Sequence, residues 1–246
     1  MKKLMAWSAF LGGSFLAAAL GLVIYLGMNG AAVSADVGAA AVLAGPSGSG
    51  EQPKEETLQA ASDQTTKTYE RIVVLDVEAS DELTGPEKEA LYRIEKKCGE
   101  LLEREGILTY GVSETDKEAG TDEKLTLVEE TNASLYLGLM FDKDEDKELF
   151  GSYVCYNSLY FRPWLTNGSF ADRMERSVVT AIEGRALGLV EVEEGILQEM
   201  SIPAAIVCPG YLSHEKEGKL LLTESYQDRI AEGICSGVIE TFKELE

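Results

Sequence analysis

The sequence predicts an α/β fold, a three-layer domain in which a mostly parallel sheet is flanked by helices. The run IVVLD at 72–76 places four apolar residues in a row, three of them β-branched, which is typical of a strand buried on both faces. Apolar residues at helical spacing predict amphipathic helices at 86–105 and 224–245. Predicted strands alternate with predicted helices along the chain, and this order favours parallel strands joined by helical crossovers.

Local signals give the bounds of the first strand and helix. Pro86 suits the first turn of the helix at 86–105, and Gly106 ends it. Ligands of open α/β sheets bind beyond the carboxyl ends of the strands, so we expect a functional site at residues 76–87. The other predicted elements are a strand at 107–110, a helix at about 122–132, strands at 134–141 and 151–157, a helix at 170–186 and a strand at 202–207.

The chain is strongly acidic. It has 43 Asp and Glu against 22 Lys and Arg, which gives a formal net charge of −21. Such a surface repels nucleic acid, so no nucleic-acid partner is expected. The four cysteines form no C-x-x-C pair, which argues against a zinc ribbon or a redox motif. Free buried thiols are expected, and one disulfide is left open if the domain lies outside the cytoplasm, for Cys98, Cys155, Cys208 and Cys235.

Residues 1–28 predict a membrane anchor. Lys2 and Lys3 precede the uncharged, mostly apolar residues 4–28, which are enough to cross a bilayer as a helix. The lysines favour the cytoplasmic side, so we expect a single-pass protein of the cell membrane whose C-terminal part is extracytoplasmic. The alternative is a secreted protein, because Val33-Ser34-Ala35 resembles the cleavage site of a signal peptide.

Residues 29–68 predict a flexible linker. They are rich in Ala, Gly, Ser, Glu and Gln and contain almost no large apolar side chains. Such a segment cannot bury enough surface to fold alone. The folded domain is therefore expected at 69–246.

Four segments of this domain resemble, in order, a known family. IVVLD at 72–76 resembles its first strand, and EKEALYRIEKKCGELLEREG at 87–106 resembles its first helix. Thr131-Asn132 followed by ASLYLGLMFD resembles a segment that ends in a metal ligand. PAAIVCPGYLSHEKEGKLLLTESYQDRIAEGI at 203–234 resembles the catalytic turn and the final helix. The family is that of the zinc-dependent N-acetylmuramoyl-L-alanine amidases, which cleave peptidoglycan and have a fold similar to zinc exopeptidases.

The resemblance implies a zinc site and also shows where this chain departs from it. Family members hold zinc with two histidines and a glutamate, and a second glutamate acts as the acid and base. Glu87 stands at the position of the glutamate ligand. Ala79 and Met140 stand at the positions of the two histidines, and Cys208 stands at that of the catalytic glutamate.

These substitutions predict that zinc binding is lost. Alanine has no ligand atom, and a thioether is a poor ligand for zinc. His214 is the one histidine of the chain, so no shift of the alignment supplies two imidazoles. We therefore predict no zinc or other cofactor, no catalytic residue, and a vestigial cleft formed by Ala79, Glu87, Met140 and Cys208.

The residues of this predicted cleft and its surroundings allow two other chemistries. Cys208 and His214 lie six residues apart and could form a nucleophile and its base, although a cysteine at a strand end is usually a small buried apolar residue. Acidic residues of the same crevice could bind a hard cation such as calcium, although solvated carboxylates beside a helix start are the simpler interpretation, for Glu78, Asp81, Glu82 and Glu87.

The function expected from these observations is binding rather than catalysis. We predict a membrane-anchored extracytoplasmic domain, attached through residues 4–28, that resembles an amidase without being one. Its expected partners are peptidoglycan fragments or a protein of cell-envelope remodelling. The alternative is a divergent but active N-acetylmuramoyl-L-alanine amidase, and a third hypothesis is a purely structural domain.

Overall fold

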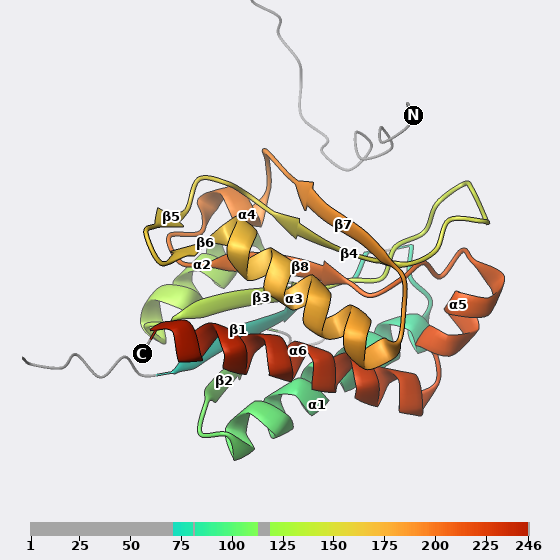
Figure 1. The fold of residues 1–246 in the computed structure, drawn as a ribbon, viewed down its shortest axis with the longest axis horizontal. Coiled ribbons are helices and arrows are strands. Elements are labelled where there is room, and N and C mark those ends of the chain that lie inside the picture. Colours follow the sequence, from blue (N-terminus) through green and yellow to red (C-terminus); the bar gives the residue numbers. More distant parts are fainter. Residues whose placement is uncertain (1–70, 81, 113–118, 246) are drawn as a thin grey trace, which may run out of the picture. The chain divides into compact units, whose positions relative to one another are not determined.

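The computed structural model describes residues 71–80, 82–112 and 119–245, and these form an α/β domain (Figure 1). The main sheet has six strands, in the order β2-β1-β3-β8-β4-β7. These strands are β1 (Ile72–Val77), β2 (Leu108–Gly111), β3 (Leu135–Leu139), β4 (Ser152–Tyr156), β7 (Ala186–Glu191) and β8 (Ala204–Cys208). A small hairpin is made by β5 (Phe161–Arg162) and β6 (Leu165–Thr166). The helices are α1 (Gly85–Arg104), α2 (Thr121–Glu130), α3 (Asn167–Ile182), α4 (Ile196–Glu199), α5 (Glu215–Leu221) and α6 (Glu224–Leu245).

Most strands of the sheet run parallel, as predicted. β1 pairs in parallel with β2 and β3, and β3 pairs in parallel with β8. β4 is antiparallel to β8 and parallel to the edge strand β7. The carboxyl ends of β1, β3 and β8 therefore lie along one edge of the sheet, and the end of β4 lies at the opposite edge.

Helices cover both faces of the sheet, which confirms the three-layer prediction (Figure 1). Alternate residues of β1 point to opposite sides, as the pleat of a strand requires. Val73 and Leu75 belong to the core beneath α1, α3 and α6, whereas Ile72 and Val74 belong to the smaller core beneath α2 and α4. The continuous apolar run of β1 is thus explained by burial on both sides.

One predicted helix was misplaced. The sequence predicted a helix at 170–186, whereas α3 begins at Asn167, because the Thr166 hydroxyl accepts a hydrogen bond from the N–H of Ser169 at its start. It ends at Ile182, because Glu183 adopts a left-handed conformation with φ of 53°. The following residues form β7, an edge strand that the sequence did not predict because its mostly exposed side chains give no apolar run.

The four cysteines are buried and free, so no disulfide forms among them. The predicted anchor at 4–28 and linker at 29–68 lie outside the described residues, and the domain start at residue 69 stays a prediction. Among the helices that the structure describes, none is both long and apolar enough to span a bilayer.

A close approach of α3 and α6 yields a first prediction. A Cβ atom at Gly233 would lie 2.7 Å from the Cα of Val178 and 3.0 Å from the carbonyl oxygen of Ser177. We expect Gly233→Ala to lower the free energy of unfolding by about 1–3 kcal/mol, because the two helices must separate. Urea unfolding measures this. Gly85→Ala is the control, since no atom lies within 4 Å of its Cβ position, and an equal effect in both variants would contradict the prediction.

Candidate functional site

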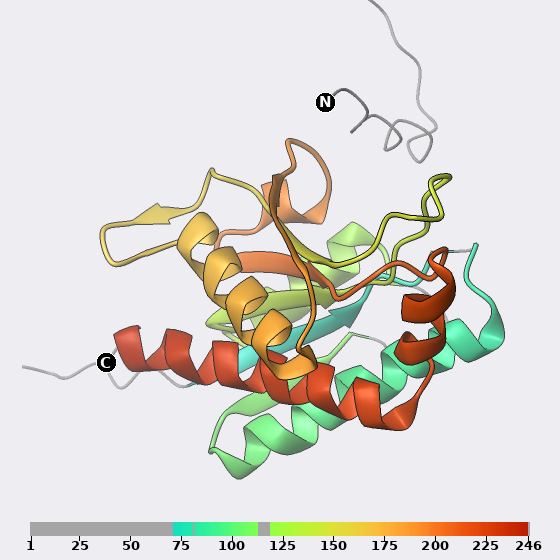
Figure 2. The ribbon, with the colours of Figure 1, turned by 45° about the vertical axis from the view of Figure 1, so that its right-hand side comes forward.

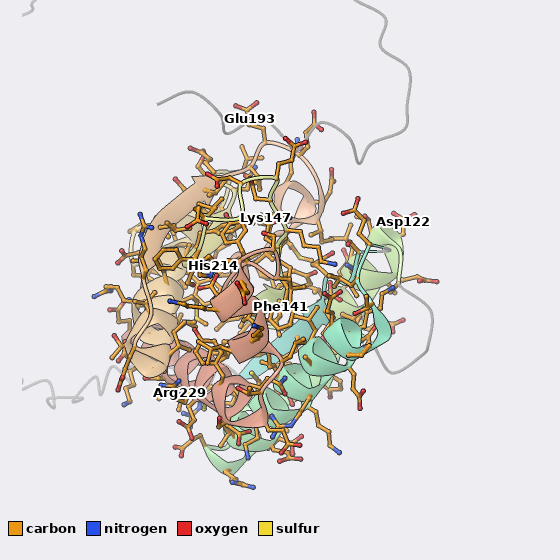
Figure 3. All side chains as sticks on the ribbon, turned by 90° about the vertical axis from the view of Figure 1, so that its right-hand side faces the viewer. Asp122, Phe141, Lys147, Glu193, His214 and Arg229 are labelled. Carbon is orange, nitrogen blue, oxygen red and sulfur yellow. The ribbon has the colours of Figure 1, made fainter. Side chains whose placement is uncertain are left out.

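The positions at which the sequence predicted a vestigial cleft lie at the carboxyl edge of the parallel strands, where Ala79 and Cys208 are buried. Ala79 follows β1, Met140 follows β3, and Cys208 ends β8. The N–H of Glu78 donates to the Leu139 carbonyl at 2.9 Å, and the N–H of Met140 donates to the Val207 carbonyl at 3.0 Å, so the three strand ends are in register. The structure therefore brings three of the four predicted positions to one edge. Figure 3 views the molecule from this side, with Phe141 and His214 near the centre.

Glu87, the fourth position, lies in the first turn of α1 and is already engaged. Its Oε2 atom accepts hydrogen bonds from the N–H of Thr84 at 2.6 Å and from Nζ of Lys143 at 3.0 Å. The ammonium group of Lys143 also donates to the Glu82 carbonyl at 2.9 Å. Partial burial works to raise the pKa of Glu87, but these two donors outweigh it and hold the pKa below its ordinary value. Glu87 is thus a carboxylate paired with a lysine.

Cys208 presents a neutral thiol. Its side chain is fully buried, with Sγ 3.4 Å from the Gly210 carbonyl oxygen. Burial, reinforced by the negative charge of Asp142, raises the pKa of the thiol well above its ordinary value. Nδ1 of His214 accepts a hydrogen bond from the N–H of Glu217 at 3.2 Å, and its ring stacks on Phe150 with centroids 5.0 Å apart. In this arrangement His214 caps α5 and does not hydrogen-bond to the cysteine.

The residues of the vestigial cleft do not fit a zinc ion. Ala79 has no donor atom and Met140 offers a thioether, so among these four side chains only Glu87 and Cys208 carry suitable ligand atoms, whereas a zinc site needs at least three protein ligands. In the part of the chain that the structure describes, no group of three or more His, Cys, Asp and Glu side chains is arranged to hold a metal. Asp81 of the acidic crevice lies outside the described residues.

A buried charged cluster beside the cleft was missed by sequence reasoning. Nζ of Lys124, from α2, lies 2.6 Å from Oδ2 of Asp76 and 2.9 Å from Oε1 of Glu78. The Tyr136 hydroxyl of β3 donates to Asp76 at 2.5 Å and to Glu78 at 3.2 Å. These four side chains form what we call the lysine cluster. They connect α2 to the end of β1 and to Tyr136 in β3.

The lysine cluster contains a carboxyl group with a raised pKa. Burial and the neighbouring charge of Asp76 raise the pKa of Glu78 from 4.5 to about 7, although Lys124 opposes the shift. Burial works to lower the pKa of Lys124, but the charges of Glu78 and Asp76 outweigh it, so the pKa rises and the ammonium form persists. The cluster therefore exchanges a proton near neutral pH.

This proton gives the second prediction. Because the pKa of Glu78 is about 7 in the folded state and 4.5 ordinarily, the folded state binds more protons between these values. Its contribution to stability must then fall as the pH rises through that window. We expect Glu78→Gln to be more stable than the wild type at pH 8 by up to about 3 kcal/mol, and to lose most of this advantage at pH 5.

Urea unfolding at pH 5 and pH 8 measures the difference. Glu145→Gln is the matched control, because Glu145 is exposed in the loop after β3. It should change the two free energies equally. For each variant, the difference in free energy of unfolding from the wild type is compared between pH 5 and pH 8. If this difference changes no more for Glu78→Gln than for Glu145→Gln, the prediction is wrong.

Two further carboxylates brace the loops that border the cleft. Glu217 of α5 is buried and accepts hydrogen bonds from the N–H of Gly151 at 3.0 Å and from the N–H of Tyr211 at 2.7 Å. Asp142 accepts a hydrogen bond from the Tyr153 hydroxyl at 2.7 Å, and burial raises its pKa. The loop after β3 is thereby joined to β4 and to the loop after β8. Sequence gave no signal for these long-range contacts.

Comparison with known proteins agrees with this geometry. The family model described as N-acetylmuramoyl-L-alanine amidase matches residues 78–240. The chain belongs to this amidase family. The germination-specific N-acetylmuramoyl-L-alanine amidase of Bacillus subtilis is 21% identical to it over 174 residues, which are 64% of this chain and 71% of that protein.

Solved amidase structures share the fold. The amidase AmiC2 of Nostoc punctiforme superposes with a TM-score of 0.63 at 20% identity, over 71% of this chain and 98% of that chain. The CwlD amidase of Clostridioides difficile, solved in complex with the GerS lipoprotein, gives a TM-score of 0.59 at 19% identity, over 70% of this chain and 98% of that chain. The resemblance predicted from the sequence is thus confirmed for family and fold.

Proposed function

We propose that this member of the amidase family is catalytically inactive and acts by binding, as an extracytoplasmic domain tethered to the cell membrane. The observation that carries the proposal is the state of Glu87. The one family ligand that remains is paired with Lys143 at 3.0 Å and caps its own helix. No imidazole stands beside it, since the single histidine of the chain caps α5.

An ammonium group cannot replace the metal in hydrolysis. Zinc contributes an open coordination position and lowers the pKa of its bound water to about 7. Lys143 supplies positive charge to Glu87 but no such position. The acid and base role has no candidate either, because Cys208 is buried as a neutral thiol.

Binding at the same edge is supported by its rigidity and by the family. The loops around the cleft are fixed by Glu217 and Asp142, which limits the entropy lost when a ligand binds. Amidases of this family act on peptidoglycan, so peptidoglycan fragments are one ligand class. The CwlD amidase was solved with a lipoprotein, which supports a protein of the cell envelope as the other.

The tether belongs to the proposal as well. Residues 4–28 are uncharged and follow Lys2 and Lys3, and the linker at 29–68 separates them from the domain. We place the domain outside the cytoplasm, anchored or, after cleavage of a signal peptide, secreted.

Metal content and turnover test the loss of catalysis. We expect the purified full chain to contain far less than one zinc per chain and to release no stem peptides from cell wall. Stoichiometric zinc together with peptide release would establish the alternative, a divergent active amidase. Lys143→Ala is the sharper variant, because it frees Glu87. If the side chains around Glu87 provide too few ligand atoms for zinc, Lys143→Ala also binds no zinc.

Calorimetry with muropeptides then separates the ligand classes. Heat of binding that saturates at one ligand per chain would identify peptidoglycan fragments. If none of the muropeptides gives a heat of binding, a protein partner or a purely structural role remains.

A further inference from the structure

Two exposed apolar side chains lie in the β5–β6 hairpin and in the segment directly before it. Leu159 is 69% exposed and Trp164 is 62% exposed, and these are the two most exposed large apolar side chains among the described residues. Figure 2 shows the hairpin extending beyond the sheet and the helices. Exposed apolar side chains of this size can contact a partner or a lipid surface.

The base of the hairpin is built to hold it in place. Asn157 is buried and its amide donates to the Val192 carbonyl at 2.7 Å. Asn167 is also buried; its amide nitrogen donates to the Asn157 carbonyl at 2.8 Å, and its amide oxygen accepts from the N–H of Ala204 at 2.9 Å. Two buried amides thus attach both ends of the hairpin to the sheet, so the exposed tip stands on a fixed base.

The hairpin and the N-terminal side of the domain share one edge of the sheet. β4 ends at the edge where β1, β3 and β8 begin, because β4 is antiparallel to β8. The described chain starts at Arg71, directly before β1, at this same edge. In the sequence, the segment 29–70 leads from the apolar residues 4–28 to this start of the described chain.

Charge makes the hairpin differ from the rest of the domain. Residues 149–171 contain no Asp or Glu, although the chain carries 43 of them, and this is the longest such stretch within 71–245. The tip instead carries Arg162, whose guanidinium lies 5.7 Å from the centre of the Tyr160 ring. Exposed Glu105 and Glu130 precede β2 and β3 at the same edge and would repel anionic lipid, which restricts any membrane contact to the projecting tip.

We propose that the hairpin at 158–166 inserts Trp164 and Leu159 into the interfacial layer of the bilayer that holds residues 4–28. This inference rests on the membrane tether of the proposed function. Tryptophan and tyrosine favour that layer, since their rings are apolar with one polar group. The tether keeps the domain at high local concentration near the bilayer, so a small apolar contact suffices. The vestigial cleft, at the opposite edge of the sheet, then faces away from the membrane and towards the cell wall.

Fluorescence of the full chain in phosphatidylcholine vesicles tests the contact. The chain has two tryptophans, so Trp7→Phe leaves Trp164 as the single reporter. We expect blue-shifted emission, quenching by brominated acyl chains and loss of quenching by aqueous iodide. Adding anionic lipid to the vesicles should weaken these signals, because Glu105 and Glu130 lie at the same edge.

Leu220→Trp, in a chain that also carries Trp7→Phe and Trp164→Phe, is the matched control. Leu220 is 45% exposed on α5, next to the cleft edge, and its replacement should stay accessible to iodide. Quenching of this reporter by brominated lipid would overturn the orientation. If the chain floats with the vesicles but iodide quenches Trp164, the tether holds and the proposed contact of the hairpin with the bilayer is wrong. A protein partner of the hairpin would then be favoured.

A chain that does not float with the vesicles would overturn the tether and this inference together. Zinc content and peptide release are independent of both results. The loss of catalysis is therefore tested separately from the membrane contact.

Discussion

Replacing Lys124 with methionine is expected to lower the free energy of unfolding by about 3–5 kcal/mol, which is enough to unfold many small domains. Lys124 is buried, and its ammonium group contacts Asp76 at 2.6 Å and Glu78 at 2.9 Å. Methionine preserves the volume and the apolar contacts of the side chain but removes the charge. Two carboxylates then remain at the end of β1 with only the Tyr136 hydroxyl as a shared donor.

The pH dependence identifies the cause. Glu78 has a pKa of about 7 with the lysine in place, and removal of the lysine raises it further. At pH 5 Glu78 is protonated in both proteins, so one unpaired charge is gone and the loss of stability should be smaller than at pH 8. Urea unfolding at the two pH values gives both numbers.

Lys219→Met is the control for removing an exposed lysine. Lys219 pairs with Glu215 on the surface of α5 at 2.8 Å, and solvent screens such an exposed pair, so its removal should change the free energy of unfolding little. If Lys124→Met and Lys219→Met lower the free energy of unfolding equally, the buried lysine cluster contributes no more to stability than an exposed ion pair.

The sequence predicted the central strands well because they are buried on both faces. The apolar runs at 72–76 and 134–141 correspond to β1 and β3, whose residues are all buried. β7 is an edge strand whose side chains are exposed or half-buried in no regular order, and β5 and β6 are strands of only two residues each. Tertiary contacts determine whether such segments form strands, and the local sequence pattern does not predict them.

The sequence predicted which strand ends lie together, but it did not predict the contacts of the residues there. Ala79 and Met140 follow β1 and β3, and Cys208 ends β8; the parallel order of these strands places their ends together. The pairing of Glu87 with Lys143 joins residues far apart in the sequence, and a charge pattern alone assigns both to solvent. Lys124 left one local signal, since it lies four residues before buried Val128 and therefore on the inward face of α2.

Replacing Glu217 with alanine is expected to lower the free energy of unfolding by about 2–4 kcal/mol and to loosen the cleft. The carboxylate accepts hydrogen bonds from the N–H groups of Gly151 and Tyr211 in a buried site. Alanine leaves both donors without their acceptor, and each buried donor left unsatisfied costs about 1–3 kcal/mol. Glu215→Ala is the matched control on the same helix, because Glu215 is exposed and pairs only with Lys219 among the ion pairs described.

Amide hydrogen exchange distinguishes a local from a global effect. If Glu217 braces the cleft, Gly151 and Tyr211 lose protection in Glu217→Ala before the strands β1 and β3 do. Uniform loss of protection would assign Glu217 to general stability instead. Local loosening should also weaken any muropeptide binding, because the variant must order these loops when the ligand binds. The Glu217→Ala variant therefore tests the rigidity of these loops separately from the Glu87–Lys143 pair, which it leaves in place.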